Sequence, residues 1–168
     1  IDDLIINFNN NTTPVCTEPI NQATGLILTA EPTSINGTFT AAIPPVNNYL
    51  IVRSTNSSLS ASPVDGVTYI AGQSLGGGTI ISIGSANTFT DAGLNPTTTY
   101  YYFVFAINDE DCLGGPNYLS TNPLTGSSTT LTLAACVAPT ASATALILTP
   151  SNNTIQGSFT ASASANRY

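Results

Sequence analysis

The sequence contains no lysine, histidine, tryptophan or methionine, and its only two basic residues are arginines. Without histidine there can be no Ser-His-Asp or Cys-His relay and no imidazole-bound metal, and without lysine there is no Schiff base and no P-loop lysine. Nine carboxylates remain as the strong acid or base groups. The composition therefore predicts a protein that is not an enzyme and uses no cofactor.

The formal net charge is −7. This charge would repel nucleic acid phosphates and anionic lipid headgroups, so neither is an expected partner. The longest apolar run, residues 100–107, is far shorter than the roughly 20 residues that a membrane-spanning helix needs. We therefore expect no membrane insertion.

Threonine (26 residues), serine (17) and asparagine (17) together favour half-exposed strands and turns over helices. Short β-rich runs recur at roughly ten-residue spacing between glycine, proline, asparagine and serine, which is typical of an all-β antiparallel sandwich. The predicted strands are residues 24–30, 34–42, 48–55, 66–70, 79–84, 87–90, 98–107 and 126–133.

The sequence also repeats itself at a spacing of 120 residues. The matches are residues 26–29 with 146–149, residues 39–41 with 159–161, Cys16 with Cys136, Pro19 with Pro139, Thr24 with Thr144, Ile35 with Ile155 and Gly37 with Gly157. This pattern predicts one complete domain at residues 16–135 and an incomplete second copy at residues 136–168, which should lack order unless further strands complete it. Residues 1–15 are interpreted as the end strand of a preceding domain, at residues 1–8, plus a linker. The first residues lack the basic start of a signal peptide, so either a signal was removed or the chain is cut from a longer one. The repeat favours the second alternative, and we expect a piece of a longer repeat array.

Residues 89–108 resemble the passage of fibronectin type III domains that carries a Leu-x-Pro-x-x-x-Tyr corner, here Leu94, Pro96 and Tyr100. The resemblance implies an immunoglobulin-like antiparallel sandwich in which the Tyr100 hydroxyl bonds to nearby backbone and fixes the crossing between two sheets. The tryptophan usual in the second strand of that family is absent, and Phe39 stands in its place.

Residues 49–54, 63–69, 74–78 and 112–118 look more narrowly like repeats of large secreted and surface proteins of Bacteroidetes-type bacteria. This resemblance implies a location outside the cell or on the bacterial outer surface, often reached by type 9 secretion. It does not imply a reaction.

Three cysteines leave one without a partner in this chain. The repeat, together with the fibronectin-like pole at which the chain would enter, favours a disulfide between Cys16 and Cys112, with Cys136 paired beyond the first copy. A bond from Cys112 to Cys136 that staples neighbouring copies is the alternative, and free thiols are a third possibility.

Two features are candidate sites. Asp109, Glu110 and Asp111 could share a Ca²⁺ ion, although a solvated turn is the simpler interpretation because calcium-loop spacing is lacking. In residues 98–107, Tyr100, Tyr102, Val104 and Ala106 should face the core, which places Tyr101, Phe103 and Phe105 in an aromatic strip on the outer face. This strip would bind sugar rings or another module if it is open, and would form a second small core if the long insertion at residues 54–79 folds over it.

Two functions follow as hypotheses. The first is a non-catalytic structural or adhesive repeat of a large bacterial surface protein or filament. The second is an accessory or carbohydrate-binding module of a secreted enzyme. Expected partners are neighbouring repeats, surface glycans or other surface proteins, and further copies that complete the missing strands.

Overall fold

The computed structural model describes residues 13–110 and 112–162. The predicted strand at residues 1–8 lies outside this part of the chain, as do Asp111 and Arg167. The described residues form strands joined by turns, with no helix, so no helix in this part has the length and hydropathy needed to cross a bilayer. The strands are β1 (Thr24–Ala30), β2 (Ser34–Thr40), β3 (Asn48–Ser54), β4 (Ser74–Leu75), β5 (Gly78–Gly84), β6 (Thr88–Ala92), β7 (Thr99–Asn108), β8 (Asn117–Tyr118), β9 (Leu124–Thr129), β10 (Thr144–Pro150) and β11 (Ile155–Thr160).

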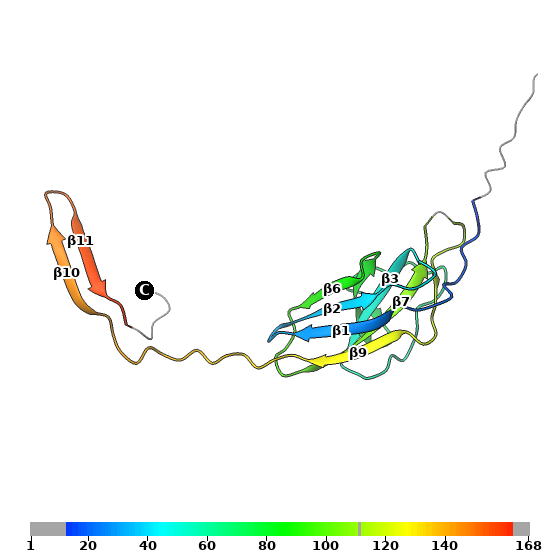
Figure 1. The fold of residues 1–168 in the computed structure, drawn as a ribbon, viewed down its shortest axis with the longest axis horizontal. Coiled ribbons are helices and arrows are strands. Elements are labelled where there is room, and N and C mark those ends of the chain that lie inside the picture. Colours follow the sequence, from blue (N-terminus) through cyan, green and yellow to red (C-terminus); the bar gives the residue numbers. More distant parts are fainter. Residues whose placement is uncertain (1–12, 111, 163–168) are drawn as a thin grey trace, which may run out of the picture. The chain divides into compact units, whose positions relative to one another are not determined.

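The first unit, which extends to Leu133, is an antiparallel β-sandwich of two sheets (Figure 1). One sheet has the order β1-β2-β6, and the other has the order β4-β5-β3-β7-β8 with β9 also paired to β7. All these strand pairs are antiparallel. The predicted all-β sandwich is confirmed.

The core between the sheets follows the alternation of β7. Tyr100, Tyr102, Val104 and Ala106 face this core, where the Phe39 ring packs edge-on against the Tyr49 ring with centroids 4.9 Å apart. The predicted inward face of this strand is therefore confirmed. Phe39 lies in the core at the position where the resemblance would place a tryptophan.

One predicted strand is wrong. Residues 66–70 form an irregular loop instead of a strand, beginning at a turn with Gly66 at φ 74°. Backbone bonds here are local or irregular, as when the Val67 amide donates to the Val64 carbonyl at 3.2 Å. The apolar residues that suggested a strand serve a loop, from which Tyr69 packs against the outer face of β7.

The second unit begins at Ala134, and its described strands are β10 and β11, which form an antiparallel hairpin. The prediction that this stretch lacks order by itself is wrong for the hairpin. Its turn is closed locally, because the Ser151 amide donates to the Thr154 carbonyl at 2.7 Å and the two side-chain oxygens lie 2.8 Å apart. Local closure needs no partner strand.

Candidate functional site

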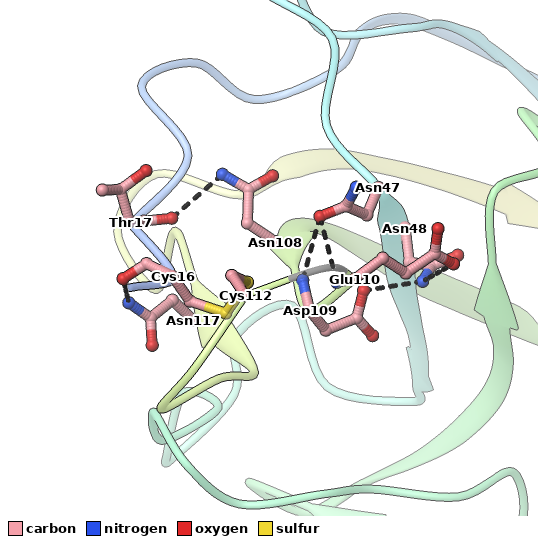
Figure 2. The surroundings of a disulfide bond; sticks show 9 residues. All are labelled: Cys16, Thr17, Asn47, Asn48, Asn108, Asp109, Glu110, Cys112 and Asn117. Carbon is pink, nitrogen blue, oxygen red and sulfur yellow. Dashed lines mark hydrogen bonds between the residues drawn. A yellow bond between two sulfur atoms is a disulfide. The ribbon is translucent and has the colours of Figure 1, made fainter. Parts of the chain in front are cut away.

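A disulfide between Cys16 and Cys112 closes one pole of the sandwich (Figure 2). The two Cα atoms lie 4.8 Å apart although the residues are separated by 96 positions. The predicted pairing is confirmed, and the alternative bond from Cys112 to Cys136 does not form. Cys136 is exposed and carries a free thiol.

Hydrogen bonds hold the incoming chain against the same loop. The Cys16 amide donates to the Leu113 carbonyl at 2.8 Å, and the Leu113 amide donates to the Pro14 carbonyl at 2.7 Å. Two asparagine side chains add to this, since Asn117 donates to the Cys16 carbonyl at 2.8 Å and Asn108 donates to the Thr17 carbonyl at 2.9 Å. The disulfide therefore ties together two segments that are already paired.

The acidic run beside this pole is engaged by two asparagines, as Figure 2 shows. Asn48 Nδ2 donates to Asp109 Oδ1 at 2.8 Å and to Glu110 Oε1 at 3.4 Å, while Asn47 Oδ1 accepts the amides of Asp109 and Glu110. Asp111 lies outside the described residues. Within residues 13–110 and 112–162, no group of three acidic, cysteine or histidine side chains is placed to hold a metal. The arrangement is that of a hydrogen-bonded turn.

The predicted corner forms at the start of β7. Leu94 is buried, and the Tyr100 hydroxyl accepts the backbone amide of Asn95 at 3.1 Å. Buried Thr130 supports the same turn, because its hydroxyl donates to the Asn95 carbonyl at 2.6 Å and accepts the Thr98 amide at 3.0 Å. Pro96 lies half-buried between these contacts. These residues position the strands, and the hydroxyls of Tyr100 and Thr130 are engaged in the hydrogen bonds of the corner.

A buried charged network, not predicted from the sequence, joins the two sheets. Asp91 of β6 is 5% exposed, and its two carboxylate oxygens each accept one bond at 2.9 Å, from Arg53 of β3 and from the Tyr102 hydroxyl of β7. The Arg53 guanidinium also lies over the Tyr100 ring, 5.6 Å from its centroid. One signal in the sequence could have indicated this network. Asp91 follows Phe89 by two positions, so alternation along the strand places this acid on the same inward face.

Burial raises the pKa of the Asp91 carboxyl above its ordinary value, and the bonds from Tyr102 and Arg53 partly oppose this rise. Burial and the neighbouring Asp91 carboxylate also raise the pKa of Tyr102. A carboxyl whose pKa is higher in the folded chain stabilises the fold below its unfolded pKa and loses that contribution as pH rises through its folded pKa. Near neutral pH the buried Asp91 carboxylate therefore needs the positive charge of Arg53 as its counter-ion.

Replacement of Arg53 by methionine should lower the free energy of unfolding by about 3 kcal/mol at pH 7, because it leaves a buried carboxylate without its counter-ion. This is the low end of the range for a buried pair, since the Arg53 side chain is 25% exposed. The pKa of Asp91 should rise further, so the difference from the wild type should shrink at pH 3, where the carboxyl is protonated. Urea unfolding of both proteins at the two pH values measures this. Measured between Asp91→Asn and the Asp91→Asn, Arg53→Met double variant, the loss caused by Arg53→Met should no longer depend on pH. An equal loss at both pH values when Asp91 is present would contradict the proposed role of Asp91.

The predicted aromatic strip on the outer face of β7 is covered. Phe103 is 5% and Phe105 is 1% exposed, and Leu59, Tyr69 and Leu75 pack with them in a second hydrophobic core. These three residues come from the covering segment, residues 55–77, which connects β3 to β5. The alternative of an open strip is therefore wrong for Phe103 and Phe105, and the favoured alternative, a second small core under the insertion, is confirmed.

Tyr118 fastens the covering segment. Its hydroxyl donates to the Val67 carbonyl at 2.8 Å, its amide donates to Asp65 Oδ1 at 2.7 Å, and its ring meets the Tyr69 ring edge-on at 5.7 Å. Burial, with nearby Tyr69 as the next cause, raises the pKa of Tyr118 to about 12. The tyrosine therefore stays neutral and keeps its donated hydrogen bond across the physiological pH range.

Three open grooves lie near these sites. One of 250 Å³ lies beside half-buried Tyr101, between Ser57 of the covering segment and Thr125 and Ser127 of β9. The second, of 520 Å³, is lined by residues 20–24, Thr40, Ala41, Ile43, Leu119, Thr121 and Asn122. This second groove has neither an aromatic ring nor a charged side chain on its walls. The third groove, of 440 Å³, lies along Phe103 and Phe105 and is lined further by Ser57, Ser58, Leu59, Ser62, Asn122, Pro123 and Thr125. Because Phe103 and Phe105 are almost fully buried, half-buried Tyr101 is the more accessible ring among these three grooves.

No protein-family model matches the sequence, and no curated protein matches it. Among solved structures, the chain is similar to a computationally redesigned β-sandwich protein, with TM-score 0.47 and 19% identity over 71% of this chain and 98% of that one. It is similar to the fibronectin type III domain of human fibronectin type III domain containing protein 3, with TM-score 0.47 and 18% identity over 70% of this chain and 90% of that one.

A third similar structure is the pectate lyase Pel3 from Pectobacterium carotovorum, with TM-score 0.42 and 19% identity. That match covers 62% of this chain and 27% of the lyase. At these identities the similarities concern the fold alone. The two sheets and the tyrosine corner of the first unit give it a fibronectin type III-like sandwich fold.

Proposed function

We propose that this chain is a non-catalytic structural or adhesive module of a large extracellular protein, one of several similar modules that act as spacers along a bacterial surface protein or filament. The observation that carries the proposal is the disulfide between Cys16 and Cys112. A disulfide persists in oxidising surroundings, which supports a place outside the cytoplasm. The sandwich fold is also that of many extracellular modules.

The position of the disulfide suits a spacer under tension. It encloses β1 through β7, so a pull on the two ends of the sandwich cannot extend those strands. In the first unit beyond residue 15, only residues 113–133 can be drawn out while the bond is intact. A pulled module therefore keeps most of its structure.

Stretching single oxidised molecules by their ends tests this proposal. We expect the sandwich to release about 70 Å of chain when it gives way, and about 400 Å after reduction, at about 3.4 Å per residue. A release of about 400 Å from unreduced molecules would show that the disulfide does not carry load. In that case the chain would not be the proposed spacer.

The second candidate is an accessory carbohydrate-binding module, and the groove at Tyr101 is the observation that favours it. A half-buried tyrosine between serine and threonine side chains could stack on a sugar ring and bond to its hydroxyls. The covered Phe103 and Phe105 leave little further ring surface, so we rank this candidate below the first.

Electrophoresis of the chain through gels that contain soluble polysaccharides separates the two candidates. We expect unchanged mobility with plant and bacterial glycans. Retardation that Tyr101→Ala abolishes and Tyr101→Phe preserves would instead support the carbohydrate module, because the second variant keeps the ring.

A further inference from the structure

The hairpin β10-β11 repeats the hairpin β1-β2 in its backbone register. Thr24 pairs with Thr40, and the pairing then shifts and resumes at Ile27 with Thr38, while Thr144 pairs with Thr160 and resumes at Ile147 with Ser158. The two hairpins also share a positive φ at the point where the pairing shifts, 64° at Gly25 and 54° at Ala145, the equivalent residue of the copy. The two hairpins therefore present the same shape.

The apolar side chains on one face of the two hairpins are also nearly the same. Leu26, Leu28, Ile35 and Phe39 correspond to Leu146, Leu148, Ile155 and Phe159. In the first unit this face packs into the core, where Ile35 is fully buried. In the second unit three residues of this face are exposed, with Ile155 at 69%, Leu146 at 67% and Leu148 at 59%.

The sandwich shows what covers such a face. The Phe39 ring packs on Tyr49 of β3, and a methyl carbon of Leu26 would lie 2.9 Å from a Cβ at Gly126 of β9, so this glycine makes room for the leucine. Gly37 pairs with Phe89 of β6, and a Cβ at Gly37 would collide with the Phe89 ring. The receiving surface thus consists of Tyr49, Phe89 and Gly126.

Gly157 leaves space for a side chain from such a receiving surface. Glycine weakens a strand unless something needs the space of its missing side chain. At Gly37 the space is filled by the Phe89 ring, whereas a Cβ at Gly157 would meet only Leu148 and Ile147 of its own hairpin. A glycine at this position fits a ring supplied by another strand.

We propose that β10-β11 of one chain seats on the sandwich of a second copy of this chain, in the place of that copy's β1-β2. There β11 would pair with the edge of β6, with Gly157 opposite Phe89, and Ile155 would enter the core where Ile35 now lies. The copies would be linked by exchanged hairpins. This assembly extends the proposed spacer role but does not depend on it.

Seating the hairpin requires the receiving β1-β2 to leave. The exchange replaces one set of contacts by an almost identical set, so the contacts alone favour neither state, while joining two chains carries the entropic cost of association. The equilibrium therefore shifts toward exchange only when β1-β2 is weakened. The main difference is Pro150 in place of Ala30 at the strand end. A receiving chain with a weakened β1-β2 therefore reveals the exchange.

The test uses an isotope-labelled acceptor chain carrying Ile35→Asp and Ile155→Asp, which disables both of its hairpins. At a temperature at which this acceptor alone is unfolded and the wild type is folded, unlabelled wild-type chain is added and the acceptor is followed by NMR. We expect the folded fraction of the acceptor to rise about tenfold with excess wild type. A one-to-one complex should appear in native mass spectrometry.

A donor carrying Ile155→Asp alone is the control, because its sandwich is intact and its hairpin is disabled. This donor should not rescue the acceptor. The absence of rescue by the wild type, or equal rescue by both donors, would overturn the proposal. Amide exchange provides a direct measurement, since the Gly157 amide of the wild-type donor should become protected only in the complex, where it faces β6 of the acceptor.

Discussion

Replacing Cys16 and Cys112 together by serine should lower the free energy of unfolding by about 4 to 5 kcal/mol, the loop-entropy value for a bond that closes roughly 100 residues. The 96-residue separation gives this bond a large effect, because the unfolded chain gains the freedom of nearly the whole sandwich. The paired backbone around Cys16 and Leu113 should hold the native geometry, so the variant should fold in the same topology. Urea unfolding of the variant and the wild type measures the loss.

The third cysteine provides the control for this prediction. Cys136 is exposed and unbonded, so Cys136→Ser should leave the free energy of unfolding within about 0.5 kcal/mol of the wild type. A reducing agent should destabilise the Cys136→Ser variant as much as the double substitution does. If reduction leaves its unfolding midpoint unchanged, the bond does not contribute as argued.

Phe105→Ala should cost about 4 kcal/mol, in the range for a buried phenylalanine replaced by alanine. Phe105 is 1% exposed and lies at the centre of the second core, between β7 and the covering segment. Its loss should weaken the hold on that segment as well as on the sheet. Urea unfolding measures the cost, and limited proteolysis should cut faster within residues 55–77.

Tyr101→Ala is the matched control, because Tyr101 lies on the same face of the same strand but is only half-buried. We expect a loss of about 1 kcal/mol and little change in proteolysis. Equal costs for the two variants would mean that the covering segment does not seal the outer face. The second core would then contribute little to stability.

Much of the sandwich could be predicted because its strands carry local signals. The alternation in β7 gave the correct inward face, and the corner at Leu94 and Tyr100 placed the start of that strand. Two strands were missed, β4 and β8, because each has two residues and so cannot show an alternation. Residues 66–70 were wrongly predicted as a strand for a related reason, since apolar side chains of a loop can pack into a core without forming a strand.

The charged network could not be predicted for a different reason. Arg53 and Asp91 are 38 positions apart, and their contact depends on how the two sheets face each other. Strand periodicity tells which side a residue faces but not which residue it meets across the core. The disulfide was predictable because the repeat supplied a second comparison within the same chain.

The two cores on either side of one sheet also limit how this sequence can change over time. Every residue from Tyr102 to Ile107 of β7 is buried, so this strand has no solvent-facing position there at which a polar residue would be harmless. An ordinary strand of an antiparallel sandwich can vary at every second residue. In distant homologues this apolar string should diverge more slowly than the surrounding threonine- and serine-rich strands, and it offers the best marker for recognising them.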